Sequence, residues 1–128
     1  MSEMQKKLVA IYDKLKPVLQ QYESPFIPVF NLDSKYDLWS YKEDIEVNGK
    51  KRDELFFASL IIQSNYVGFY YMPIYVDKNL KESLDPELLK LLKGKSCFHI
   101  KKLDDKLEAQ IEKALKIGFE LYKEKGWI

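Results

Sequence analysis

Cysteine and histidine are almost missing from this chain of 128 residues, because it contains only one of each. A single cysteine excludes an internal disulfide bond and is typical of a reducing compartment. No run approaches the ~18 consecutive apolar residues that a membrane-spanning helix needs. The first residues also lack the uninterrupted apolar stretch of a signal peptide. We therefore expect a soluble, cytoplasmic protein without a membrane span.

An excess of charge is missing as well, since 21 basic and 20 acidic residues leave a formal net charge of +1. Nucleic-acid-binding domains usually carry a strongly basic field, and anionic membrane surfaces attract basic segments. The charge balance therefore predicts neither a nucleic-acid partner nor a membrane partner.

Apolar and aromatic residues, by contrast, are well represented. Hydrophobic residues make up 46% of the chain, and the aromatic share of 14% includes nine tyrosines. A chain of this length fits one domain and can bury a core without metal or disulfide support. Tyrosine serves both cores and binding surfaces. We expect a single domain over residues 1–128 and treat the placement of its tyrosines as the central question.

The most apolar stretch, Phe56 to Tyr75, predicts two β-strands that meet in a tight turn at Ser64-Asn65. Counting outward from that turn puts an apolar set on one face, and we expect it to form the core: Phe56, Leu60, Ile62, Val67, Phe69 and Tyr71. The opposite face is mixed and holds Phe57, Tyr66, Tyr70 and Met72. A slip of one residue would exchange the two faces, so the register decides this assignment.

Amphipathic helices are predicted at both ends of the chain. Apolar residues recur at helical spacing from Ser2 to Glu23, and again after Asp105, which we expect to cap the last helix. Gly118 lies in the middle of the second apolar stripe and predicts a close approach of helix and sheet. Both helices are expected to turn their apolar stripes toward the core.

The remaining elements complete the predicted order α-β-β-β-α-β-α. A strand over Tyr36–Val47 leads into a hairpin turn at Asn48-Gly49. A short helix follows Asp85 and ends at Gly94, and a last strand covers Ser96–Lys101. This order predicts an α+β fold, in which an antiparallel sheet of four to six strands has its helices packed on one face.

Catalytic residues are not indicated by any motif. Cys97 and His99 share a strand face, but no other cysteine or histidine exists to complete a metal site. A Cys–His nucleophile pair needs hydrogen-bond contact, whereas same-face strand neighbours lie ~6.5–7 Å apart. We predict no catalytic residues and no enzyme activity.

Carboxylates gather in the predicted hairpin, where Glu43, Asp44 and Glu46 lie across from Asp53 and Glu54. Such a group can bind a hard cation. Lysines and an arginine are interleaved with these acids, so we favour surface charge pairs over a metal site. No metal ion and no cofactor are predicted.

The mixed face of the central hairpin is the candidate interaction surface: Phe57, Tyr66, Tyr70 and Met72. Aromatic residues and methionine are enriched at the centres of protein interfaces. Three coverings are open for this face: the connector from Phe26 to Phe30, a second copy of the chain in a homodimer, or a ligand or another protein. The sequence does not specify a small-molecule ligand.

Two stretches resemble a known family. Asn65 to Tyr71 (NYVGFYY) and Lys93 to Ile100 (KGKSCFHI), followed by the terminal helix, are similar to the YdhG-like family of bacterial domains. The resemblance covers Trp39 to the C-terminus and implies a curved antiparallel sheet with helices packed against it, similar in shape to secretion chaperones. It therefore implies a YdhG-like domain of α+β type.

One branch of that family is linked to frataxin-like iron delivery, which needs an acidic surface ridge. The acids of the first predicted helix, Glu3, Asp13 and Glu23, are scattered among lysines, so no iron ligand is carried over. We expect a small cytosolic binding or adaptor domain without catalytic machinery of its own. The alternative function is a frataxin-like intracellular iron-binding chaperone.

Overall fold

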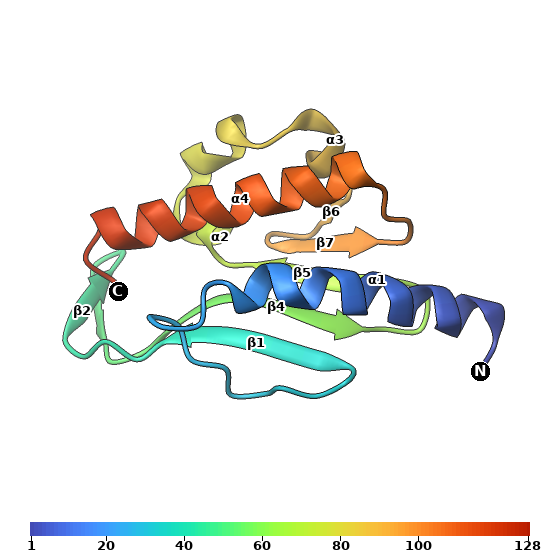
Figure 1. Ribbon diagram of the computed structural model, residues 1–128. Coiled ribbons are helices and arrows are strands. Elements are labelled where there is room, and N and C mark those ends of the chain that lie inside the picture. Colours follow the sequence, from blue (N-terminus) through green and yellow to red (C-terminus); the bar gives the residue numbers. More distant parts are fainter.

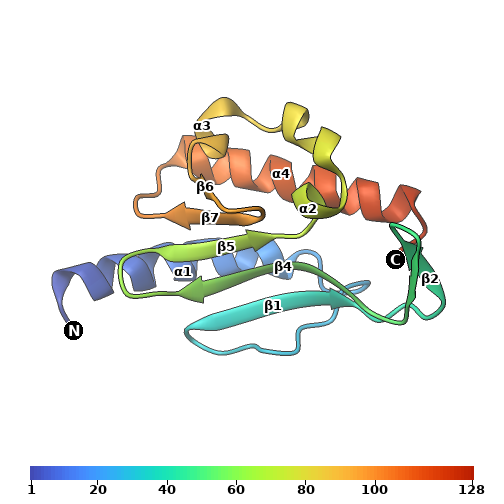
Figure 2. The ribbon, with the colours of Figure 1, turned by 180° about the vertical axis from the view of Figure 1, so that it is seen from behind.

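The computed structural model describes all 128 residues and has an α+β fold, as the sequence predicts. A five-stranded antiparallel sheet forms one layer, and two long helices, α1 (Glu3–Gln20) and α4 (Asp105–Glu124), form the other. Figure 1 views the molecule from the side of these helices, and Figure 2 views the sheet from behind. None of the helices combines the length and apolarity that crossing a bilayer requires.

The strands of the sheet follow the order β1-β4-β5-β7-β6, and every neighbouring pair is antiparallel. A separate hairpin is formed by β2 and β3. The strands are β1 (Lys35–Ser40), β2 (Ile45–Val47), β3 (Lys50–Arg52), β4 (Leu55–Ile62), β5 (Val67–Tyr71), β6 (Leu92–Lys93) and β7 (Cys97–Ile100). Three short helical segments join β5 to β6: α2 (Pro73–Val76), the 3₁₀ helix η1 (Lys78–Ser83) and α3 (Pro86–Leu89).

The predicted register of the central hairpin is confirmed. Leu60 pairs with Phe69, and the flanking pairs of β4 and β5 also match the count from the Ser64-Asn65 turn. Leu60 and Phe69 are fully buried, together with Val67 and Tyr71. These side chains face α1 and α4, and we call this side of the sheet the inner face and the opposite side the outer face.

The predicted faces of Phe56 and Phe57 are wrong: Phe57 lies on the inner face, and Phe56 lies on the outer face. Trp39 pairs with Phe56 while the preceding Leu38 pairs with Ala58, so Phe57 is an extra residue in β4, a β-bulge. Phe57 therefore turns into the core, where it is 0% exposed. Phe56 is only half-buried and packs beside Trp39 on the outer face.

The inner face is covered by the apolar stripes of α1 and α4. Four tyrosines lie in this core with no exposed surface, and each donates its hydroxyl hydrogen to an acceptor: Tyr12, Tyr36, Tyr71 and Tyr122. Gly118 of α4 lies against Pro73 and Tyr71, and a Cβ atom there would come within 2.6 Å of the Pro73 ring. The close approach predicted at Gly118 is confirmed.

Three details of the predicted elements are wrong. The expected strand over Tyr36–Val47 is interrupted, because Asp44 adopts a left-handed φ of 56°. The helix after Asp85 ends at Leu89, and Gly94 instead forms the turn between β6 and β7 with a φ of 73°. Three short helical segments, α2, η1 and α3, rather than a single short helix, lie between β5 and β6.

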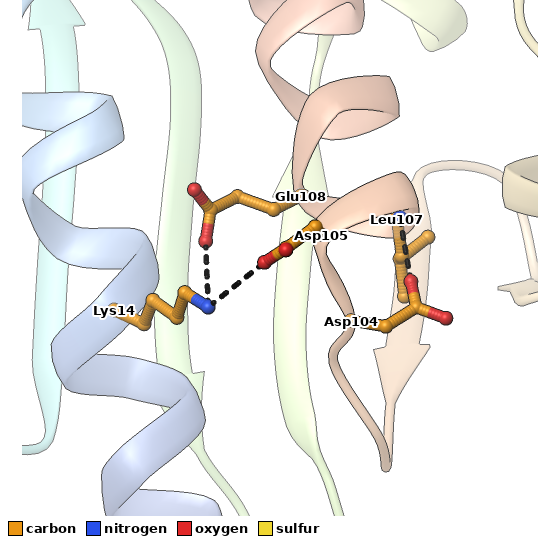
Figure 3. A network of polar contacts seen from close by, with 5 residues as sticks. All are labelled: Lys14, Asp104, Asp105, Leu107 and Glu108. Atoms are coloured by element: carbon orange, nitrogen blue, oxygen red, sulfur yellow. Dashed lines mark hydrogen bonds and ion pairs between the residues drawn. The ribbon is translucent and has the colours of Figure 1, made fainter.

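Asp104, not Asp105, caps α4, because its carboxylate accepts a hydrogen bond of 2.8 Å from the backbone N–H of Leu107 (Figure 3). Asp105 lies in the first turn, where it joins α4 to α1 through the ammonium group of Lys14 at 3.4 Å. Glu108 lies 3.5 Å from the same ammonium group and, as the main cause, raises the pKa of Lys14. The two long helices are thus tied together at one end.

The connector between α1 and β1 extends the sheet by isolated bridges rather than covering the outer face. Ile27 pairs with Trp39, and Asn31 pairs with Tyr36. Its apolar residues divide between two environments: Phe26 is buried in the core, whereas Ile27, Val29, Phe30 and Leu32 are exposed. The connector therefore adds an edge to the sheet.

Candidate interaction surface on the outer face

No helix packs over the outer face of the sheet, which Figure 2 shows in front of α1 and α4. Its side chains come from the four longer strands and from the turn between β4 and β5. The half-buried members are Trp39, Phe56, Ile61, Tyr66, Tyr70, Cys97 and His99. Ile27 and Tyr41 extend this set at the β1 edge with 50% and 42% of their surface exposed.

The structure keeps two of the four predicted surface residues on this face. Tyr66 and Tyr70 lie there, whereas Phe57 points into the core because of the bulge. Met72 is half-buried and lies where β5 gives way to α2, with its backbone N–H bonded to the carbonyl oxygen of Phe57. The expected cluster of four is therefore not formed as a unit.

Gly68 shapes the centre of the outer face by leaving room for its neighbours. The ring of Tyr70 lies over Gly68, and its Cε2 atom is 2.7 Å from where a Cβ would stand. The Tyr70 hydroxyl accepts a hydrogen bond of 3.2 Å from the side-chain amide of Gln63. Burial is the main cause that raises the pKa of Tyr70. This tyrosine is thus held flat against the strand.

His99 lies beside this centre, opposite Gly68 on the neighbouring strand. Its imidazole stacks on the ring of Tyr66, with centroids 3.6 Å apart and planes at 8°. Partial burial lowers the pKa of His99, and the nearby Lys93 and Lys101 lower it further. The imidazole is therefore uncharged at neutral pH and acts as a flat, weakly polar part of the surface.

A second aromatic cluster occupies the β1 side of the outer face. The rings of Trp39 and Phe56 lie 5.3 Å apart, and Tyr41 stacks on Trp39 at 6.5 Å. The indole N–H of Trp39 donates a 3.1 Å hydrogen bond to Asp37. This bond fixes the orientation of the Trp39 indole ring on the outer face.

Asp37 is the polar anchor of this cluster and is almost completely buried, with 5% of its surface exposed. Its Oδ1 atom accepts hydrogen bonds from the backbone N–H groups of Val29 and Phe30, at 2.8 and 2.9 Å. Buried carboxylates need such partners to offset the loss of water. Asp37 therefore fixes both the connector and Trp39.

Cross-strand pairing joins the two clusters into one surface. Asp37, Ser59, Tyr70 and Cys97 form a continuous row across four strands. Ser59 is only 4% exposed although no helix covers it, because large neighbours on the same face shield it. The outer face is thus a packed layer of side chains rather than a loose collection of surface residues.

Cys97 and His99 lie on this layer two positions apart along β7. Burial raises the pKa of the Cys97 thiol, which is the opposite of the shift that activates a nucleophilic cysteine. Both side chains are therefore uncharged at neutral pH, and both contribute to the packing of the outer face.

The carboxylates of the β2–β3 hairpin are paired with neighbours rather than gathered around a centre. Asp53 accepts a 2.9 Å hydrogen bond from the backbone N–H of Asp44, and Lys51 lies 3.7 Å from the Asp44 carboxylate. No group of three or more histidine, cysteine, aspartate or glutamate side chains lies together in a way that could hold a metal ion.

Comparison with known proteins adds no relative to this description. No family model matches the chain, and neither a curated protein nor a solved structure matches it. The resemblance to YdhG-like domains stays a prediction.

Proposed function

We propose that this chain is a small binding domain without catalytic machinery of its own, which associates through its outer face with a second copy of the chain. The observation that carries the proposal is the aromatic layer that no helix covers. Trp39, Tyr41 and Tyr70 belong to the residue types that dominate the energetics of protein interfaces.

The internal bonding of the layer supports a binding role. Trp39 is held by Asp37, Tyr70 by Gln63, and Tyr66 by the ring of His99. Side chains that are already fixed lose little conformational entropy when a partner covers them. Preorganised aromatics therefore bind more tightly than the same rings on mobile side chains.

A second copy is a suitable occupant because the face spans four strands, and Asp37 and Gln63 already have hydrogen-bond partners within it. Two-fold symmetric packing needs only one self-complementary patch. Monomeric proteins seldom leave contiguous apolar patches above roughly a few hundred Å² uncovered. A different cytosolic protein could also cover such a face. The test below distinguishes self-association from binding to a different protein.

The test measures the molar mass by light scattering from low micromolar to near-millimolar concentration. We expect the mass to rise toward that of a dimer, and Tyr70→Asp and Tyr41→Asp to keep it at the monomer value. A carboxylate introduced into a dry interface would lose its water without gaining a partner. Far-ultraviolet circular dichroism checks that each variant still folds.

The matched control is Met4→Asp, which changes another exposed apolar residue, 47% exposed, on α1 rather than on the sheet. This variant should dimerise like the unchanged chain. A wild-type chain that stays monomeric at every concentration would contradict self-association and leave a different protein as the occupant. If acrylamide then quenches Trp39 freely and both Asp variants fold normally, the layer is ordinary surface and the proposal fails.

No observation favours the iron-binding alternative, because its ligands would have to come from carboxylate side chains that do not lie together. The proposed location in the cytoplasm rests on the single cysteine of the sequence.

A further inference from the structure

A pocket of about 460 Å³ lies where three segments that are distant in the sequence meet. In both views the closed end of the β6–β7 hairpin lies beside α2 (Figures 1 and 2). The amide group of Asn48 in the β2–β3 turn lies 3.5 Å from the carbonyl oxygen of Val76. The lining residues are Asn48, Ile74, Tyr75, Lys78, Lys81 and Lys95.

The pocket is lined by three lysines and by no acidic side chain. Lys78 and Lys81 are three residues apart in η1, and 3₁₀ geometry places such residues directly above one another. Lys95 comes from the opposite side, next to the left-handed Gly94 of the β6–β7 turn. The lysines that line the pocket therefore come from two separate segments.

None of these three ammonium groups has a carboxylate partner. The ion pairs of the chain involve other lysines: Lys6, Lys14, Lys51, Lys106 and Lys113. Three lysines and no carboxylate line the pocket, so its field is positive. The arrangement is thus complementary to a ligand with two or more negative charges.

Tyr75 gives the pocket a second chemical character. Tyr75 is 49% exposed, whereas the neighbouring Ile74 is buried. The ammonium group of Lys95 lies 5.7 Å from the centroid of the Tyr75 ring. A planar group stacked on Tyr75 would therefore place an attached anion within reach of Lys95.

We propose that this pocket binds a nucleotide, with its phosphates among Lys78, Lys81 and Lys95 and its base on the ring of Tyr75. Lysine ammonium groups bind phosphates as point charges, and bases stack on aromatic side chains whatever their sequence. The volume lies within the range of about 300–1,000 Å³ that small-molecule sites occupy. The near-zero net charge of the whole chain favours this compact ligand over an extended polyanion.

The test is isothermal titration calorimetry of the full chain with four probes: ADP, AMP, pyrophosphate and adenosine. We expect saturable one-to-one binding of ADP, weaker binding of AMP and pyrophosphate, and the weakest binding of adenosine. The triple change Lys78→Gln, Lys81→Gln and Lys95→Gln should weaken ADP at least tenfold, since three charge contacts are lost. Tyr75→Ala should weaken ADP but leave pyrophosphate within twofold, because only the base stacks.

The matched control triple changes Lys7, Lys90 and Lys102 to Gln, which removes the same net charge from exposed lysines outside the pocket. It should bind ADP like the unchanged chain. Equal losses in the two triples would reveal a diffuse charge effect and overturn the site. Absence of saturable heat with all four probes would overturn it as well. Equal losses of ADP and pyrophosphate in Tyr75→Ala would leave an anion site and remove the base from the proposal.

Discussion

The inner and outer faces of the sheet use the same residue types for different purposes. On the inner face, Tyr71 and Tyr122 are fully buried, and their hydroxyls bond to the backbone of α4 and β4. On the outer face, Tyr66 and Tyr70 are half-buried, and their partners are the side chains of His99 and Gln63. Backbone partners bind elements of the fold together, whereas side-chain partners orient rings within one surface.

This comparison teaches that an aromatic count alone does not separate core from surface. Burial raises the pKa of Tyr71 and Tyr122 far more than that of Tyr70. The tyrosines of the inner face are therefore part of the stability of the domain, and those of the outer face are available for contact with another molecule.

The neighbouring phenylalanines of β4 allow the strongest test of this difference. Phe57→Ala should lower the free energy of unfolding by about 3–5 kcal/mol, because it empties a fully buried ring site. Phe56→Ala should cost only about 1 kcal/mol, since the ring is already half in water. Urea unfolding followed by circular dichroism measures both. Equal costs would show that the bulge does not divide the two rings between the faces.

The two glycines that lie against tyrosine side chains give a smaller contrast. Gly118→Ala should cost about 1–3 kcal/mol, because the added methyl group would overlap Pro73 and the Tyr71 hydroxyl within the packed core. Gly68→Ala meets only the ring of Tyr70, which can swing toward solvent, so its cost should stay below about 1 kcal/mol. Thermal unfolding compares them. A larger loss at Gly68 would mean that the outer layer is as rigid as the core.

The smallest expected effect concerns the pH response of the outer face. Folding lowers the pKa of His99 below its ordinary value of about 6.5. As the pH falls past that value, the unfolded chain therefore takes up the proton before the folded chain does. The contribution of His99 to stability is therefore present above that pH and is lost as the pH falls through this window.

Proton NMR measures this pKa directly, because the chain has one histidine. Tyr66→Ala should raise the pKa of His99, since water would return to the exposed side of the imidazole. His99→Gln should flatten the pH dependence of unfolding below about pH 6.5, the ordinary pKa of histidine. A pKa that does not respond to Tyr66→Ala would show that the stacked ring contributes no shielding.

Much of the fold could be read from local patterns. The Ser64-Asn65 turn determined the register of β4 and β5, and Gly118 indicated the close contact of α4 with the sheet. The face of Phe57 could not be predicted, because the bulge depends on pairing with β1, more than fifteen residues earlier in the chain. A strict alternation carried through a bulge assigns the wrong face to every residue beyond it.

The outer face was only partly predictable for the same reason. Asp37, Trp39 and Tyr41 are spaced two residues apart and therefore share one side of the first strand. This spacing could have placed the two aromatic residues on the same face of the sheet as Tyr70. The contact of Trp39 with Phe56 depends on the pairing of β1 with β4, which no local pattern contains. The same limit applies to the pocket lysines, because Lys95 comes from the β6–β7 turn and the other two from η1.

The bridges that Ile27 and Asn31 make to β1 also decide how this protein can assemble. They occupy the backbone groups of β1 that an incoming strand would need, and the opposite edge, β6, has only two residues followed by Gly94 and Lys95. Short and covered edges resist strand addition from other molecules. Growth of the sheet into an open fibre is thereby blocked, while closed pairing through the exposed face remains available.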